Sequence, residues 1–547
     1  MRRCLAGALA VLATMALAAP AAQAGPARAT DRWLAVLEDP LAARSPSLVE
    51  RVLARTGAAR AGPGAPGLGV VTVRGPDEAI GRLRRDPAVA GVSREWVREL
   101  RRLPDDPALA TAEGEYAVPA GTPVQWALSR QGFPAAWDVT TGAAARVAVL
   151  DTGVDASHPE LAGKIASADA VAAADPRSDA DGHGTHVSGL ACAATDDGRG
   201  VAGAGWGCRL HVVKLGTDLT GGIPDENIVR GLELAIGHAP HAISMSFGGG
   251  PDSAALDAAI QAAYERGIVL VAAASNQEDD EQGAPASHLQ PGDAANLAAG
   301  RGLVVTAADF TDRRAGTGRG PQISLAAYGF FDESAGPPGV ISTYPGSATA
   351  QDVPACSPLV LPACPRRAFS GDDSYAYLQG TSMSTPQVAA LAALVGALNP
   401  HLAAGEKLRL IKQSARRAGG WSPELGWGIL DAGAAVDAAR RIDRLAPSSS
   451  ARLRGRRGGR VRLRLHARDR AGGEGLVPSG VRRLELYGRR GRRPARRLRR
   501  VDARRALALR LRPGVWRLHT RALDAAGNRE AAPPRPDVRV RIRRPRA

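Results

Sequence analysis

The 547-residue chain is poor in aromatic, sulfur-containing and lysine side chains. Aromatic residues make up 4% of it, and it contains 5 cysteines and 4 methionines. Only 4 of its 71 basic residues are lysines, and the other 67 are arginines. Beyond the amino terminus no stretch approaches the ~20 apolar residues of a membrane-spanning helix, which excludes a multispanning membrane protein. With 44% hydrophobic and 23% charged residues, the composition is globular, which excludes a fibrous or wholly disordered chain.

The excess of positive charge lies at the carboxyl end of the chain. The formal net charge is +17. Residues 451–547 contain 32 arginines, no lysine and 7 acidic residues, or +25, so the preceding residues sum to 17 − 25 = −8. The basic tail is therefore a separate feature. The length corresponds to three or four domains of ~150 residues.

The amino terminus has the pattern of an export signal. Arg2 and Arg3 precede an apolar run over residues 5–19, and Ala22-Gln23-Ala24 provides a small-x-small site. We expect residues 1–24 to be a cleaved secretory signal, the alternative being an uncleaved anchor. The protein is then secreted and extracellular, with association with the cell surface left open.

Four cysteines remain after such a cleavage: Cys192, Cys208, Cys356 and Cys364. An even number in an exported chain favours disulfides. Pairing by proximity gives Cys192–Cys208 and Cys356–Cys364, one of three connectivities. Neither spacing resembles a Cys-x-x-Cys metal knuckle.

Three segments follow the signal. Residues 25–118 contain two strand patterns, a helix opened by Pro76 and a further extended run, which predicts a small α+β unit. Their end belongs to an exposed linker over residues 104–123. Residues 119–446 alternate buried strand patterns (147–150, 210–213, 242–245, 268–271) with helical ones, which predicts a doubly wound parallel α/β sheet. Residues 447–547 alternate apolar and polar side chains and predict an all-β sandwich.

Three motifs in the α/β segment carry chemistry, and each has alternatives. Asp151 of Asp151-Thr-Gly follows a buried strand; it could cap a turn or form half of an aspartic protease, which needs two such carboxylates. His183 lies in a glycine-rich run three residues before His186. It could act as a base or as a metal ligand. Ser382 stands at the entrance of an apolar helix, a nucleophile or an ordinary helix cap.

Together, and in the order Asp, His, Ser, these motifs resemble the subtilisin-like serine proteases. Residues 426–432 are similar to the closing Gly-x-Gly motif of that family. The resemblance implies that Ser382 is the nucleophile, that His183 is its general base, and that Asp151 orients the histidine. Asn276 is implied as the oxyanion donor. The reaction needs no cofactor.

Substrate binding is implied for the segment after residues 242–245. Ser246, Phe247 and Gly248 are expected to line the cleft and to pair with an extended peptide. Ser275 replaces the usual glycine before Asn276. The acidic run over residues 278–281 could attract basic substrates or be a solvated loop.

A structural Ca²⁺ is a further implication, because oxygen ligands suit this ion. The residues are those of a loop resembling the family's calcium loop together with two preceding polar side chains: Gln125, Glu160, Asp197, Arg199 and Val201. The alternative is an acidic surface turn.

The first segment resembles the inhibitory prodomain of the family. This implies a zymogen that cuts itself between residues 112 and 124, for example at Tyr116–Ala117. Protein or peptide substrates and the chain's own prodomain are the expected partners, and a monomer is expected.

The basic tail has two interpretations, as a binding surface or as a solvated surface without a partner. Arginines neutralise phosphates, but only Tyr487 and Trp516 are aromatic there, which disfavours nucleic acid. An anionic cell-surface polymer is a partner that suits an exported protein. In the second interpretation, the tail is a solvated β module in a chain that uses arginine throughout. The competing function for the whole chain is a catalytically idle protease fold that binds through this tail.

Overall fold

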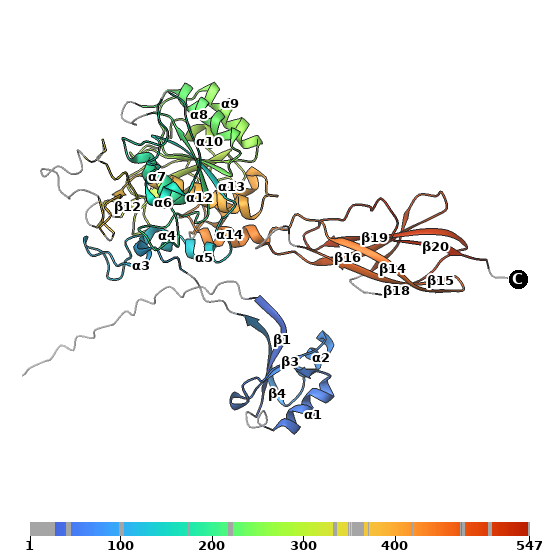
Figure 1. Cartoon of the computed structure of the whole chain (residues 1–547). Coiled ribbons are helices and arrows are strands. Elements are labelled where there is room, and N and C mark those ends of the chain that lie inside the picture. Colours follow the sequence, from blue (N-terminus) through green and yellow to red (C-terminus); the bar gives the residue numbers. More distant parts are fainter. Residues whose placement is uncertain are drawn as a thin grey trace, which may run out of the picture. The chain divides into compact units, whose positions relative to one another are not determined.

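The computed structural model describes residues 28–39, 45–97, 103–172, 174–216, 222–331, 336–347, 349–350, 352, 366–369, 371–416, 419–470, 472, 476–501 and 506–544. Two compact units divide the chain, residues 1–102 and residues 103–547. Figure 1 colours both along the sequence. The expected signal segment 1–24 and the pair Cys356–Cys364 lie outside the described residues, so both stay predictions.

The first unit is an antiparallel sheet with two helices, in agreement with the predicted α+β class. The strand order is β2-β3-β1-β4. Its elements are β1 (Arg28–Leu37), α1 (Pro46–Thr56), β2 (Ala59–Arg60), η2 (Pro66–Leu68), β3 (Val70–Arg74), α2 (Asp77–Leu83) and β4 (Val89–Val97). The helix α1 was not predicted. It starts at Pro46 and buries Val49, Val52 and Leu53 against the sheet, the stripe expected of an amphipathic helix.

The second unit is built on a seven-stranded parallel sheet with the order β11-β10-β9-β8-β5-β7-β6. The strands are β5 (Arg146–Asp151), β6 (Ile165–Ala170), β7 (Arg209–Lys214), β8 (Ala242–Met245), β9 (Val269–Ala273), β10 (Gly302–Ala308) and β11 (Leu325–Tyr328). Nearly every residue of the central strands is buried, as expected for a parallel sheet covered on both faces. The doubly wound α/β prediction is confirmed.

Helices cover both faces of this sheet (Figure 1). They are α3 (Pro107–Ala110), α4 (Trp126–Arg130), α5 (Phe133–Trp137), α6 (Pro159–Ala162), α7 (His183–Cys192), α8 (Asp225–Gly237), α9 (Ala254–Glu265), α10 (Ala286–Leu289), α12 (Thr381–Leu398), α13 (Ala404–Ser414) and α14 (Ala432–Arg441). Among the described helices, only α12 is long and apolar enough to cross a membrane, but 89% of it is buried in the protein. It is the central core helix.

The order of the strands has a topological switch point between β5 and β8. From β5 the chain runs to β6 and β7 on one side, and β8 then pairs with the other edge of β5. Ligand sites of open α/β sheets lie at the carboxyl ends of strands at such a switch point. Leu150 pairs with Met245, so the following residues, Asp151 and Ser246, lie side by side at this edge.

The segment before the sheet corrects one prediction. Residues 104–123 were expected to be an exposed linker, with a domain boundary at residue 118. Instead, Asp106 and Ala108 are fully buried, and the buried Glu113 forms an ion pair with Arg367 at 2.9 Å. These contacts attach the segment to the second unit, whose boundary is at residue 103. Many of its other residues are exposed, but these buried contacts show that the segment packs on the second unit and is not a free linker.

The carboxyl-terminal residues form the predicted all-β sandwich. One sheet has the order β14-β15-β18 and the other β17-β16-β19-β20. Its strands are β14 (Ser448–Arg457), β15 (Arg460–Arg468), β16 (Val481–Arg490), β17 (Arg496–Val501), β18 (Ala506–Arg510), β19 (Gly514–Asp524) and β20 (Val538–Ile542). Alternate residues of both sheets build a common apolar core that includes Leu463, Leu486 and Leu518. A separate pair, β12 (Val340–Thr343) and β13 (Tyr375–Leu378), belongs to the α/β part.

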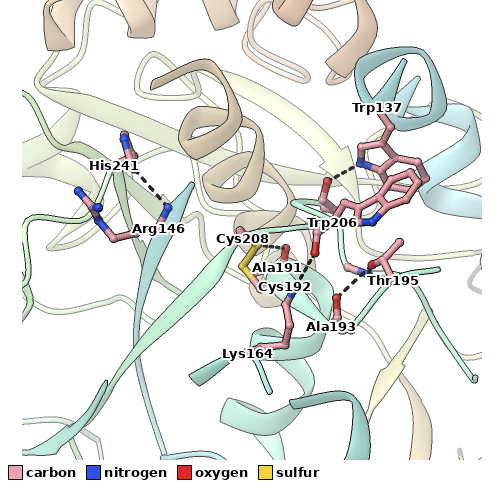
Figure 2. Close-up of a disulfide and its surroundings, with 12 residues drawn as sticks. Trp137, Arg146, Lys164, Ala191, Cys192, Ala193, Thr195, Trp206, Cys208 and His241 are labelled. Carbon is pink, nitrogen blue, oxygen red and sulfur yellow. Dashed lines mark hydrogen bonds between the residues drawn. A yellow bond between two sulfur atoms is a disulfide. The ribbon is translucent and has the colours of Figure 1, made fainter. Parts of the chain in front are cut away.

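One disulfide joins Cys192, at the end of α7, to Cys208 before β7, with 5.6 Å between the Cα atoms. Both side chains are fully buried. Figure 2 shows the bond near Trp137 and Trp206, whose rings meet edge to face with their centroids 5.5 Å apart. The predicted pairing Cys192–Cys208 is confirmed.

Candidate active site

Asp151 and His183 are joined by a short hydrogen bond. Asp151 is the last residue of β5, and His183 is the first residue of α7. Their contact, between Asp151 Oδ1 and His183 Nδ1, is 2.7 Å long. Asp151 is fully buried and His183 is 7% exposed, so the carboxylate is shielded from water and fixes one side of the imidazole ring.

Glycine at position 184 permits this approach of helix to strand. A Cβ atom there would lie 2.2 Å from the carbonyl oxygen of Gly153, a distance that the backbone cannot accommodate. The Gly184 N–H donates to Thr152 Oγ1 at 2.9 Å. The glycines around His183 therefore serve close packing, as their pattern indicated.

Asp179 is a residue that the sequence reasoning missed. Its buried carboxylate accepts hydrogen bonds from the Gly182 N–H, from the N–H and hydroxyl of Thr185, and from the Thr152 hydroxyl. It thereby ties the turn before His183 to the loop after Asp151. The signal available in the sequence was a second acid two residues before Asp181.

Opposing effects act on the pKa of His183. Burial lowers it, whereas the charge and hydrogen bond of Asp151 and the charges of Asp181 and Asp179 raise it. The net result is a pKa above the ordinary 6.5. The carboxylates thus stabilise the imidazolium form, which a general base must adopt after it takes a proton.

Ser382 and Ser246 exchange two hydrogen bonds. Ser382 Oγ donates to the Ser246 carbonyl oxygen, and Ser246 Oγ donates to the Ser382 carbonyl oxygen, both at 2.9 Å. The N-cap of α12 is Gly380, so Ser382 does not serve as a helix cap. Its hydroxyl points toward the end of β8, and hydrogen bonds of a catalytic site often take their final form only with substrate.

Asn276 follows β9 and is oriented by Thr381. Its Oδ1 accepts from the N–H and from the hydroxyl of Thr381, each at 2.9 Å. Asn276 Oδ1 therefore faces the start of α12, and Asn276 Nδ2 is left as a donor. A Cβ at Gly380, where φ is +134°, would lie 3.1 Å from Asn276 Oδ1, so glycine gives Asn276 its room beside the start of α12.

His186 does not share a site with His183. Its Nε2 contacts the carbonyl oxygen of Ala376 at 3.0 Å. The ring is fully buried, and burial lowers its pKa to about 3. It is a neutral core histidine, and the alternative of a metal bound between the two histidines is wrong.

The residues predicted to bind substrate fall into two groups. Phe247 is half-buried and Gly248 is exposed beyond β8. Ser246 is 2% exposed and bonded to Ser382, so its side chain positions the neighbouring helix instead of lining a cleft. The Ser275 N–H is bound by Gln282 Oε1 at 2.8 Å, which anchors the loop that carries Asn276.

The acidic run over residues 278–281 is partly neutralised. Glu278 pairs with Arg314 at 3.0 Å, and Asp280 pairs with Arg319 at 2.7 Å. Both acids are exposed. These contacts favour the structural interpretation of the run over attraction of basic substrates.

The sequence profile of the Subtilase family matches residues 142–428, a span that contains Asp151, His183, Asn276 and Ser382. The chain belongs to the subtilase family. The match covers more than half of the chain, and this protein is therefore a serine endopeptidase, as its motifs predicted.

Named relatives agree with this assignment. The subtilase is 34% identical over 281 residues to Subtilisin BL of Lederbergia lenta, covering 51% of this chain and 86% of the relative. It is 30% identical over 264 residues to Thermitase of Thermoactinomyces vulgaris, covering 48% and 78%. A solved protease structure from Pseudoalteromonas arctica, 28% identical, covers 58% of this chain and 97% of its own, with a TM-score of 0.48.

The residues expected to bind calcium make hydrogen bonds within the protein, and their role as ligands stays a prediction. Both polar atoms of the Gln125 amide bond to the Ala202 backbone. Asp197 is exposed, and its Oδ1 accepts from the Arg199 N–H at 3.1 Å. The Val201 N–H donates to Glu160 Oε1. Gln125, Arg199 and Val201 thus all make hydrogen bonds within the protein.

Two buried carboxylates nevertheless fit a cation. Glu160 Oε1 accepts from the Tyr375 hydroxyl at 2.6 Å, while Glu160 Oε2 and Asp106 Oδ1 are buried without a hydrogen-bond partner among the described residues. Burial raises the pKa of Glu160 to about 8 and that of Asp106 to about 6, and neighbouring acids add to both effects. Hard oxygen donors short of partners are the type that Ca²⁺ prefers. Asp106 was missed because it lies in the supposed linker.

Proposed function

We propose that this subtilase is a secreted endopeptidase that hydrolyses peptide bonds with Ser382 as nucleophile, His183 as general base and Asp151 as the group that orients His183. The observation that carries the proposal is the 2.7 Å bond from Asp151 to His183 at the same sheet edge as Ser246, which holds Ser382. A serine hydroxyl needs such a base, because it is a weak nucleophile at neutral pH.

The reaction proceeds through an acyl-enzyme. His183 accepts the proton of Ser382 Oγ as the oxygen attacks the peptide carbonyl carbon, and it then gives that proton to the leaving amine. Water repeats the sequence on the ester and releases Ser382. Asp151 holds the ring by Nδ1, so that Nε2 is the atom that moves the proton.

The oxyanion forms at the amino end of α12. The Ser382 N–H and Asn276 Nδ2 are the donors that stabilise it, and Thr381 keeps Asn276 Oδ1 turned away. An extended substrate pairs with the backbone beyond β8, with Phe247 and Gly248 in the cleft. Ser275 supports this side of the site through its loop.

Residues 25–102 act as the inhibitory prodomain, and the cut that removes them lies before Leu103. Cleavage at Tyr116–Ala117 would leave Glu113 on the removed fragment, although its side chain forms a buried ion pair with Arg367 of the protease part. It would also disturb Tyr116, whose ring meets Tyr377 edge to face at 5.6 Å. A cut before residue 103 leaves these buried contacts with the mature enzyme.

Amino-terminal sequencing and intact mass of the wild type beside Ser382→Ala test the proposal. We expect the wild type to begin near residues 98–104, whereas Ser382→Ala begins near Gly25. If both retain residues 25–102 under folding conditions, self-processing is wrong, and the idle binding protein becomes the better account. A mature chain that begins at residues 112–124 would restore the position predicted from the sequence.

A structural Ca²⁺ bound near Glu160 and Asp106 stabilises the enzyme and takes no part in the chemistry. These carboxylates hold the oxygens that lack partners. The ion would neutralise charges that are otherwise buried together, and it would fix residues 103–124 to the α/β core through Asp106.

A further inference from the structure

One sheet of the carboxyl-terminal sandwich carries arginine and no acid. The strands β14, β15 and β18 contain no aspartate or glutamate. Along β15, Arg460, Arg462 and Arg464 are exposed, whereas the alternating Val461, Leu463 and Leu465 are buried in the core. The arginines therefore form the outer face of this sheet, which is called the arginine face below.

Arginines also stand directly opposite one another across the strands of this face. Arg464 pairs with Arg452 of β14, and Arg460 pairs with Arg457 on one side and Arg510 on the other. Residues directly opposite in an antiparallel pair share a face, and like charges there are destabilising. None of these five arginines forms an ion pair within the described part of the chain. The fold thus retains an arrangement that opposes its own stability.

The other sheet of the sandwich also has arginines opposite one another, since Arg517 pairs with Arg489 and with Arg539, but it contains a buried acid as well. Glu485 of β16 is 1% exposed and lies between arginines of neighbouring strands. Arg497 and Arg529 contact it at 2.7 and 2.9 Å, and Arg483 and Arg500 lie at 3.6 Å. A general bias toward arginine would enrich both sheets alike. It does not explain why one sheet has a buried acid to balance its arginines and the other has none.

The arginine face continues into a hollow at one end of the sandwich. A cavity of about 750 Å³ lies beside the turn between β14 and β15, and seven arginines and no acidic residue line it. Arg457 and Arg510 belong both to this cavity and to the arginine face. Arg456 Nη1 donates to the carbonyl oxygen of Arg541 at 2.6 Å, so part of the lining is held in place.

We propose that the arginine face and this cavity bind a linear polymer of phosphate diesters without bases, outside the cell. Guanidinium groups match phosphate oxygens with two parallel hydrogen bonds. Alternate side chains of one strand are about 7 Å apart and adjacent strands about 5 Å apart, a spacing that an extended polyanion can follow one charge at a time. Neutralisation by such a polymer would relieve the repulsion between opposite arginines.

The same face does not suit single-stranded nucleic acid. Such binding uses aromatic side chains on which the bases stack. The strands of the arginine face contain no phenylalanine, tyrosine or tryptophan. In the rest of the sandwich, Trp516 is buried and Tyr487 is stacked on His519. The phosphates of a polymer, and not bases, are what this surface can recognise.

Binding of fluorescent poly(glycerol phosphate) to the full chain carrying Ser382→Ala tests the proposal, with oligo(dT) of equal charge as the second probe. The variant Arg460→Gln/Arg462→Gln/Arg464→Gln removes three charges of the arginine face. Because it relieves like-charge repulsion, it should fold at least as well as its parent. The control Arg482→Gln/Arg489→Gln/Arg539→Gln removes three exposed arginines of the other sheet.

We expect the face variant to bind poly(glycerol phosphate) about tenfold more weakly at 200 mM salt, and the control less than twofold more weakly. The salt dependence of binding should also fall by about 2 units of log–log slope, at ~0.7 per phosphate contact. Equal weakening in both variants would overturn the proposal, because net charge alone would then bind. Tighter binding of oligo(dT), or no binding of either probe at 50 mM salt, would overturn it too.

Discussion

The hydroxyl of Ser246 replaces a helix hydrogen bond that Ser382 cannot make. Within α12 the Ser382 carbonyl would accept from the N–H four residues later, but that residue is Pro386, which has none. Ser246 Oγ donates to this carbonyl instead, at 2.9 Å. The start of the helix is thereby tied to the end of β8, and Ser382, the proposed nucleophile, is fixed in relation to the sheet that carries Asp151.

Ser246→Ala in the Ser382→Ala background should lower the free energy of unfolding by about 1–3 kcal/mol, since it leaves the carbonyl of residue 382 without a donor. The matched control is the same change in a chain that also carries Pro386→Ala, where the restored N–H can serve this carbonyl. Thermal unfolding of the four chains measures the coupling. An equal cost of Ser246→Ala with and without Pro386 would contradict the relationship.

The pH dependence of activity follows from the charges around His183. The base must be neutral to accept a proton, and its pKa is raised above 6.5. Therefore kcat/KM should rise with pH along a limb whose midpoint lies above 6.5. Asp181→Asn removes one of the charges that raise this pKa, and the midpoint should move to lower pH. Asp252→Asn, an exposed acid outside that set, should leave it in place; a limb below 6.5 in the wild type would show that the carboxylates do not prevail over burial.

Asn276→Ala should lower kcat by about 10²–10³ with little change in KM, because its amide donates to a charge that exists only in the transition state. The magnitude is the one known for this donor in a member of the same family. Gln277→Ala, at the exposed neighbouring position, is the control and should retain full activity. A loss confined to KM would assign Asn276 to substrate binding instead.

The sequence sufficed to single out the groups that we propose do the chemistry, because their motifs are local. Asp151 ends a strand pattern, and Ser382 stands in the first turn of a helical one. Their order along the chain was specific even though each motif alone was ambiguous. The parallel sheet then placed Asp151 beside Ser246, which bonds to Ser382, since the carboxyl ends of β5 and β8 lie at one edge.

Contacts between distant segments were not predictable in this way. Composition suggested a linker where Glu113 forms a buried ion pair with Arg367, 254 residues away. Asp179 was not singled out from the sequence, because its contacts with Thr152 and Thr185 arise only in the fold. The calcium region was predicted from one loop and two preceding polar side chains, whereas Tyr375 contacts Glu160 from a distant strand. Pairings of this kind depend on tertiary packing, which neither periodicity nor composition encodes.

The disulfide Cys192–Cys208 should stabilise the α/β part by restricting the unfolded chain. It closes a loop of 16 residues, for which the chain-entropy estimate is about 3 kcal/mol. We expect Cys192→Ala/Cys208→Ala to unfold at a lower temperature than its parent in the Ser382→Ala background. The reduced parent, which keeps both side chains, separates the loss of the bond from the loss of packing. If oxidised and reduced parent unfold alike, the bond contributes nothing.

Removal of calcium should lower the unfolding temperature of the Ser382→Ala chain, and Asp106→Asn should abolish most of that effect. The reason is that Asp106 Oδ1 and Glu160 Oε2 are buried oxygens without a hydrogen-bond partner among the described residues, and a cation would compensate the burial of their charges. Asp197→Asn is the matched control. Its carboxylate is exposed and already accepts from the Arg199 N–H, so this variant should keep the response to calcium. The experiment compares unfolding with excess Ca²⁺ and with a chelator, and it needs no catalytic activity. If Asp197→Asn loses the response and Asp106→Asn keeps it, the ion binds the loop predicted from sequence and not the buried pair.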